Sequence, residues 1–199
     1  KTSNEFSPAT QSVQGPTAIN IYERKGGNIL DVEALKIIWE LEDQMVNTPG
    51  YENFCYKQDL TGLDQLLPTE AYNQLLSQIN STTKCNYFQS FIVYLKQFMV
   101  KFGFPDPKPS DLKPELIVAF LSLPDMNTTM ITAFISKDYK STPYPTASIL
   151  RTMFTMGYPL DGYKNINDRR DDQVDKVKEF GKEFTEPIDD LFDNPRLGI

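Results

Sequence analysis

The 199-residue chain contains no histidine. Catalysis by Ser-His-Asp or Cys-His groups is therefore excluded, as is every metal site that uses an imidazole ligand. The sequence also lacks a P-loop and a G-x-G-x-x-G segment, and Gly26-Gly27 alone is too short to hold a diphosphate. We therefore expect no enzyme activity, no metal and no cofactor.

Long apolar runs and clusters of positive charge are missing as well. No stretch approaches the roughly 18 consecutive apolar residues of a membrane-spanning helix, so we expect the chain as given to be soluble. Its 27 acidic residues outnumber 20 basic ones, and the net charge of -7 repels phosphate backbones. Arg169-Arg170 is followed at once by Asp171-Asp172, so no basic stripe forms and we expect no nucleic acid partner.

Cysteine is scarce, with only Cys55 and Cys85 in the chain. Two cysteines are too few for a disulfide scaffold, and they lack the partner ligands of a zinc site. One bridge is possible and would stabilise the fold by roughly 3 to 4 kcal/mol, while two buried thiols are the alternative. Sequons at Asn80 and Asn127 also arise by chance, but they are compatible with a glycosylated chain of the secretory pathway.

Adjacent acids at Asp171-Asp172 and Asp189-Asp190 are the remaining candidates for binding a hard cation or for general acid/base chemistry. Neighbouring residues on a helix diverge by about 100 degrees, so neither pair converges on one ion unaided. We interpret both pairs as solvated helix faces. A hydrolase that uses carboxylates alone is the least favoured function.

Apolar residues are abundant enough for a folded core. They make up 40% of the chain, including 13 Phe and 10 Tyr, and can offset the entropy lost on folding. Residues 1–16 are polar and predict a flexible leader, whereas 17–199 predict a single domain. Because the chain begins at Lys1 without a signal peptide, we expect a processed product or a piece of a larger polypeptide.

Two periodic segments organise the first part of the chain. Thr17 to Arg24 alternates between two faces and predicts a strand, which Gly26-Gly27 ends. From Asn28 onward the apolar residues recur at helical spacing, with Asn28 or Asp31 as the cap. The helix stops near Asn47.

Helical spacing also dominates the middle of the chain. Tyr51 to Phe104 predicts a helical insertion, and its strongest apolar stripe runs from Phe88 to Phe102. Such a stripe could line a lipid cavity, but core packing is its more common use. Gly103 lies where a left-handed cap belongs, and a short helix is predicted from Pro114 to Leu123.

The last third predicts two strands and a helix. Thr128 to Ser136 and Thr146 to Thr155 are β-branched and apolar, and they predict antiparallel neighbours joined by Lys137 to Pro145. Acidic residues at and after Asp168 favour the start of a final helix, which Pro187 should kink or end.

The segment between the last strand and the last helix is the best candidate for a special role. It contains a turn formed by Gly157, Pro159 and Leu160. We interpret this turn as structural, because it fixes the geometry between strand and helix and carries no catalytic group.

Two blocks of sequence resemble one known group of proteins. They are Ala18–Leu30 (AINIYERKGGNIL) and Ile149–Gln173 (ILRTMFTMGYPLDGYKNINDRRDDQ). Together they resemble the first extracytosolic domain of the resistance-nodulation-division superfamily, in its branch containing Patched, Dispatched and the Niemann-Pick type C sterol transporter. The family's Gly-x-Pro-Leu turn and Asn-x-x-Asp-Arg loop have counterparts here in Gly157, Pro159, Leu160, Asn165, Asp168 and Arg169.

The resemblance implies an α+β fold, a ferredoxin-like β-α-β-β-α frame that lacks its final strand. It also implies an extracellular or lumenal domain of a polytopic transporter, which gates a hydrophobic conduit for sterols, lipids or lipid-modified proteins. Its partners would be the membrane and ectodomain parts of the same polypeptide. The alternative is a secreted or surface module that binds a protein through exposed aromatic residues or an unpaired sheet edge.

Overall fold

The computed structural model describes residues 13–57, 69, 85, 86, 88–123, 133–141 and 144–192. Its elements in chain order are β1 (Val13–Glu23), α1 (Val32–Val46), α2 (Tyr51–Phe54), β2 (Gln89–Ser90), α5 (Phe91–Lys101), η2 (Pro109–Asp111), α6 (Pro114–Leu121), β3 (Ile149–Tyr158) and α8 (Arg170–Phe192). The fold class is therefore α+β, as the sequence predicted.

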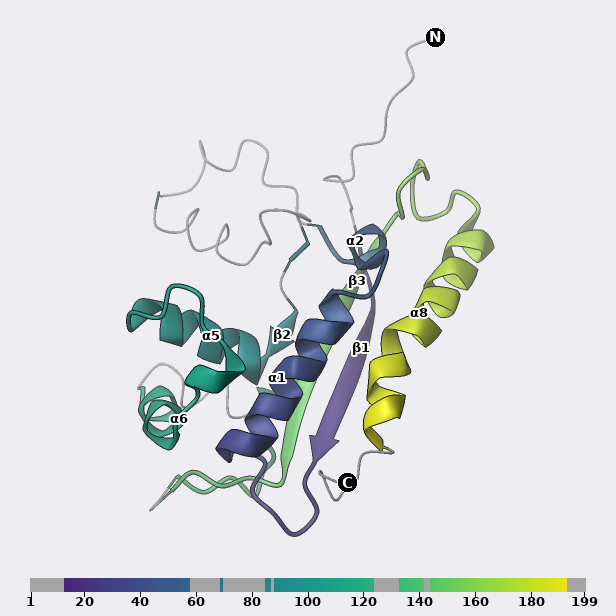
Figure 1. The fold of residues 1–199 in the computed structure, drawn as a ribbon. Helices are drawn as coiled ribbons and strands as arrows, with labels where there is room; N and C mark the ends of the chain where they lie inside the picture. Colours follow the sequence, from purple (N-terminus) through teal and green to yellow (C-terminus); the bar gives the residue numbers. More distant parts are fainter. Residues whose placement is uncertain are drawn as a thin grey trace. The chain divides into compact units, whose positions relative to one another are not determined.

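The three strands form one antiparallel sheet in the order β1-β3-β2, with β3 in the middle (Figure 1). Ser90 of β2 is the register partner of Thr152 in β3. β1 begins at Val13, so 13–16 belong to the strand and not to the predicted leader, while 1–12 lie outside the described residues.

The second strand of the sheet is not where the sequence placed it. Of the predicted strand Thr128 to Ser136, the described residues 133 and 134 are helical. The predicted antiparallel approach to the segment from Thr146 is present only as two isolated bridges, Ile135 to Leu150 and Lys140 to Thr146. The strand that pairs with β3 is β2, inside the segment predicted as a helical insertion. β2 has only two residues and leads directly into a helix, so it shows no alternation that could reveal it.

The chain divides into two compact units. The disulfide unit consists mainly of Thr48–Phe88 and Phe154–Phe184, and the α1 unit mainly of Ile19–Asn47 and Gln89–Met153, as far as the structure describes these ranges. The single domain predicted for 17–199 stays a prediction.

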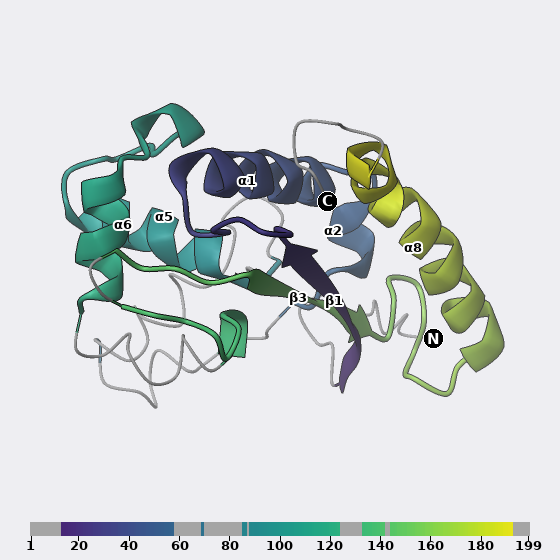
Figure 2. The same ribbon diagram turned by 90° about the horizontal axis from the view of Figure 1, so that it is seen from below.

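Helix α1 supplies much of the core of the α1 unit and lies along one face of its strands (Figure 2). Asp31 is the cap, because its carboxylate accepts a hydrogen bond from the Ala34 amide at 2.8 Å. The same carboxylate pairs with Arg24. Asn28 has another role, since its amide oxygen accepts from the amide nitrogens of Leu30 and Ala147.

Helices α5 and α6 pack aromatic residues together in the same unit. Phe91 and Phe98 contact the ring of Phe120 at centroid distances of 5.2 and 5.4 Å. The predicted stripe on α5 is buried except for Phe102, which is 61% exposed at the end of the helix. Gly103 has the expected positive φ of 93°.

The core of the disulfide unit is built from stacked aromatic pairs. Phe184 of α8 contacts Tyr51 at 5.7 Å and Phe154 at 4.9 Å, and Phe180 stacks on Phe54 at 4.2 Å. α8 continues to Phe192, so Pro187 does not end the helix as one predicted outcome required. A proline inside a helix removes one hydrogen bond and crowds the carbonyl four residues earlier, so a kink is the predicted outcome that stays a prediction.

Candidate functional site

The predicted turn residues lie at the end of β3, and the chain turns slightly later than expected. Gly157 belongs to β3, and Pro159 follows the strand through a cis peptide bond with Tyr158. The reversal occurs at Asp161 and Gly162, where Gly162 has a φ of +85° that favours glycine. Leu160 is buried just before this turn.

One buried side chain fixes the loop that follows. Gln173, in the first turns of α8, has no solvent exposure. Its amide oxygen accepts from the Leu160 amide nitrogen at 3.0 Å, and its amide group donates to the carbonyls of Asn165 at 3.1 Å and Asp168 at 2.7 Å. A single side chain thus satisfies three backbone groups of the loop and ties both its ends to the helix.

Tyr163 forms a second tie between this loop and α8. Its hydroxyl donates to the Asp172 carboxylate at 2.6 Å and accepts from the Lys176 amine at 2.7 Å. The Arg169 guanidinium lies 4.3 Å from the centre of its ring, in a cation–π contact. The hydrogen bond from Lys176 to Tyr163 raises the pKa of this lysine above its ordinary value.

The loop residues that carry the family resemblance hold the loop's own shape. The Asn165 side chain accepts from the Asn167 amide at 2.9 Å, and the Asp168 carboxylate accepts from the Lys164 amide at 2.9 Å. Arg169 donates to the Gly162 carbonyl at 3.2 Å. These contacts agree with a structural interpretation of the segment from Gly157 onward.

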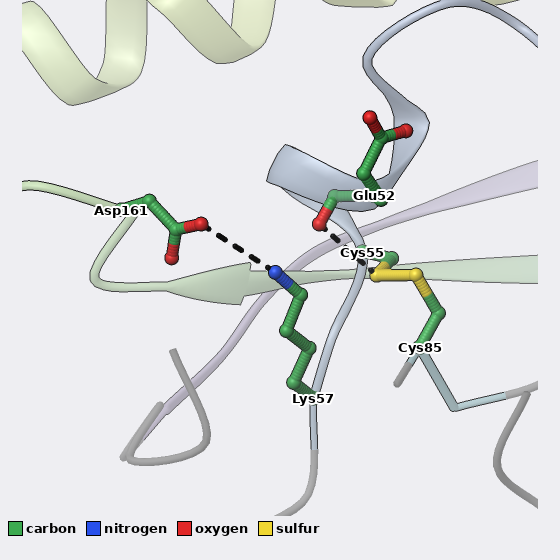
Figure 3. Close-up of a disulfide and its surroundings, with 5 residues drawn as sticks. All are labelled: Glu52, Cys55, Lys57, Cys85 and Asp161. Carbon is green, nitrogen blue, oxygen red and sulfur yellow. Dashed lines mark hydrogen bonds and ion pairs between the residues drawn. A yellow bond between two sulfur atoms is a disulfide. The ribbon is translucent and has the colours of Figure 1, made fainter. Parts of the chain in front are cut away.

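Cys55 and Cys85 form a disulfide, with their Cα atoms 5.5 Å apart and both residues buried (Figure 3). Of the two alternatives that the sequence left open, the structure has the bridge and not two free thiols. The Cys55 sulfur lies 3.7 Å from the Glu52 carbonyl oxygen. This is a packing contact, because an oxidised sulfur has no hydrogen to donate.

The disulfide holds a short backbone ladder against the end of β3. Cys55 bridges to Met156, the Tyr56 amide donates to the Thr155 carbonyl at 3.1 Å, and the Asn86 amide donates to the Tyr56 carbonyl at 2.8 Å. The Cys55 segment therefore lies beside the end of β3, and the Cys85 segment is bonded to the Cys55 segment.

A buried amine links the same ladder to the loop. Lys57 is only 6% exposed, and its amine lies 3.6 Å from the carboxylate of Asp161 (Figure 3). Asp161 is exposed, so removing its carboxylate would leave the buried Lys57 amine in an environment that solvates its charge poorly. The disulfide segment and the predicted turn thus form one connected cluster in the disulfide unit.

Several predicted sites are not among the described residues or side chains. The sequons at Asn80 and Asn127 lie outside the described residues, and the side chains of Asp189 and Asp190 are not described. Asp171 and Asp172 are exposed. Within the described part of the chain, no group of three or more metal-binding side chains occurs, and no helix has the length and apolar character to cross a membrane.

One face of β1 exposes apolar side chains. Ile19 is 56% and Ile21 61% exposed, while Tyr22, which points to the opposite face, is buried. β1 is also an edge strand, with a neighbour on only one side among the described strands. Exposed isoleucines on an edge strand are suited to contact another chain or another segment.

The sequence interpretation missed two buried polar residues, Gln173 and Glu42. Both have no solvent exposure. Each occupies a position on the apolar stripe of its helix. Gln173 lies four residues before Val177, and Glu42 lies three residues after Trp39. A polar residue at a core position of a helical stripe was the available signal.

Comparison with models of protein families, with curated protein sequences and with solved structures finds no match.

Proposed function

We propose that this chain is an extracytosolic domain of a polytopic transporter related to Patched and Dispatched. In this role it has no enzyme activity and gates a hydrophobic conduit for sterols, lipids or lipid-modified proteins. Its main partners are the membrane and ectodomain parts of the same polypeptide.

The observation that carries the proposal is the order of elements in and around the sheet. α1 lies between β1 and β2 in the chain, α8 follows β3, and the strands are ordered β1-β3-β2; α5, η2 and α6 are then an insertion between β2 and β3. A ferredoxin-like frame without its last strand has this order, because the missing strand would pair with the free edge of β1. The order therefore supports the frame that the family resemblance implies.

The disulfide supports an extracellular or lumenal location. Structural disulfides persist mainly in oxidising surroundings such as the secretory pathway and the cell surface. Cys55 and Cys85 are both buried, which protects the bond from soluble reductants. An extracellular or lumenal location accounts for this bond more simply than a reducing cytosol.

The complete reading frame of the gene tests the proposal. We expect it to contain, after Ile199, one further strand and then long apolar helices. We also expect the protein from its native source to carry the disulfide, so that alkylation adds mass only after reduction. A frame without any membrane-spanning segment on either side would contradict the transporter.

A second candidate is a secreted or surface-anchored module that binds a protein partner, and the exposed Ile19 and Ile21 favour it. Membrane fractionation of the full-length product separates the two functions. A transporter remains in membranes after alkaline carbonate extraction and requires detergent for release. A secreted module appears in the culture medium and leaves membranes without detergent.

A further inference from the structure

Glu42 of α1 is a carboxyl group with no solvent exposure in the α1 unit. The Ser90 hydroxyl donates to one of its oxygens at 2.8 Å, and the Thr152 hydroxyl donates to the other. Ser90 belongs to β2, and Thr152 is its register partner in β3. One carboxyl group therefore joins a helix to two paired strands.

The Ser90 hydroxyl has a second role, because it caps the helix that follows β2. It accepts a hydrogen bond from the Val93 amide at 3.0 Å, at the start of α5. The geometry of the Glu42 contact is thus connected to the first turn of another helix. Any change in the charge of Glu42 acts on α1, the sheet and α5 together.

The Glu42 carboxyl has no direct ionic partner among the described residues. Lys96 of α5, the base whose charge acts on Glu42, lies 2.5 Å from Asp43 and 4.6 Å above the ring of Trp39. Two other titratable groups act on Glu42: Tyr22 of β1, and the neighbouring Asp43 of α1, whose charge raises the pKa of Glu42. η2 also packs against α1, and the carboxylate of its Asp111 accepts from the Lys108 amide.

Burial is the dominant influence on the protonation of this group. Desolvation raises the pKa of Glu42 to about 7, although the two hydroxyls and Lys96 act in the opposite direction. Desolvation, with a contribution from Glu42, also raises the pKa of Tyr22, so the tyrosine remains protonated whenever Glu42 titrates.

We propose that Glu42, Ser90 and Thr152 form a proton-controlled clamp, which is tight when Glu42 is protonated and loosens α1 from the sheet when Glu42 is ionised. The proposal rests on the cluster itself and does not depend on the transporter function. It assigns Glu42 a role in pH regulation. An exposed acid of the same helix, such as Glu40, cannot have this role, because water solvates its charge.

The hydrogen bonds of the cluster can accommodate both states. Thr152 also bonds to the Tyr22 side chain, so its hydroxyl lies between a carboxyl and a phenol. With Glu42 ionised, Thr152 donates to the carboxylate. With Glu42 protonated, the acid donates to the Thr152 oxygen and Thr152 donates to Tyr22, so the carboxyl group and the threonine hydroxyl both keep a partner. The ionised state differs mainly in holding an unpaired charge away from water.

The direction of the effect follows from proton linkage. An unfolded chain releases the Glu42 proton near the ordinary pKa of 4.5, and the folded chain near 7. Between these values the folded state holds one more proton, so stability is fully present below about pH 4.5 and is lost as the pH rises to about 7. The unfolding equilibrium constant should rise by up to about tenfold per pH unit in this window.

Urea unfolding between about pH 5 and about pH 8 tests the clamp, with the fluorescence of the single tryptophan, Trp39, as the signal. The unmodified chain should lose stability as the pH rises. Glu42→Gln keeps the shape without the charge and should remove most of this pH dependence. Glu40→Gln, at an exposed position of the same helix, should leave it intact. Equal pH dependence in all three proteins overturns the proposal.

A direct titration keeps the test independent of whether the Glu42→Gln variant folds. In the unmodified chain with ¹³C-labelled glutamate carboxyls, we expect one resonance to titrate near pH 7. Amide exchange in α1, corrected for its intrinsic pH dependence, should accelerate across the same transition. Titration of every glutamate below about pH 5, or α1 exchange that does not change, contradicts the clamp.

Discussion

At the scale of single residues, polar side chains inside the core do much of the positioning. Gln173 satisfies three backbone groups of the loop after β3, and Ser90 serves both a helix end and the Glu42 carboxyl. A buried group that loses its hydrogen-bond partner retains the full penalty of its desolvation. Substitution of Gln173 or Ser90 should therefore lower the free energy of unfolding by more than the loss of the side-chain atoms alone would.

Gln173→Ala should destabilise the chain by about 2 to 4 kcal/mol, because one buried backbone amide and two part-buried carbonyls lose their partner. The amide of Leu160 should exchange with solvent at least about tenfold faster, since its hydrogen bond goes to the Gln173 side chain. Urea unfolding and hydrogen exchange measure the two effects.

Glu179→Ala is the control for this substitution, because Glu179 is an exposed position of the same helix. It should change stability by less than about 0.5 kcal/mol. Unchanged exchange of the Leu160 amide in Gln173→Ala would show that this side chain does not hold the loop.

At the scale of elements, helices with a clear apolar stripe could be predicted from the sequence, and the short strand could not. The apolar stripe of α1 placed that helix, the structure decides for Asp31 over Asn28 as its cap, and Gly103 marked the end of α5. β2 was missed because two residues carry no period, and its position depends on pairing with Thr152, which is distant in sequence.

The candidate site was predictable to a similar degree. The sequence identified Cys55, Cys85 and the Gly157 turn region, each of which carries a local signal. The contacts of Gln173 and Glu42 depend on which strands and loops come together, so a helical stripe marks their positions as buried without naming their partners. Lys57 and Asp161 form an ion pair across 104 positions of sequence, for which the chain gives no local cue.

Ser90→Ala tests how α5 and the sheet are coupled. Loss of the cap alone should cost about 1 kcal/mol. Loss of the hydroxyl that donates to the carboxylate should add about 1 to 3 kcal/mol once Glu42 is ionised. We therefore expect a larger destabilisation at about pH 8 than at about pH 5, measured by Trp39 fluorescence in urea.

Ser122→Ala is the matched control, since the Ser122 hydroxyl is exposed and donates to the Val118 carbonyl at the end of α6. Its effect should be small and equal at both pH values. A pH-independent effect of Ser90→Ala would mean that this hydroxyl does not interact with a titrating Glu42.

At the scale of the whole molecule, the division into two units predicts that a destabilising substitution in one unit increases local unfolding in that unit first. The disulfide, the Lys57–Asp161 pair and the Gln173 contacts all belong to the disulfide unit. The Glu42 cluster and the aromatic contacts of Phe120 belong to the α1 unit.

Removing the disulfide tests this division. The double variant Cys55→Ala with Cys85→Ala should lose roughly 3 to 4 kcal/mol, because the bond closes a loop with a sequence separation of 30. Hydrogen exchange should increase in α8 between Arg170 and Phe184 at denaturant concentrations where α1 remains protected. Simultaneous loss of protection in both helices would show a single cooperative unit.

The bond between Cys55 and Cys85 also determines what a protease can accomplish. A single cut anywhere between these two residues leaves both products covalently attached, so the nicked protein migrates as one species until a reductant is added. Maturation or inactivation by cleavage in that interval could then proceed without release of either fragment. The thiol state of the surroundings, and not the protease alone, would decide when the two pieces separate.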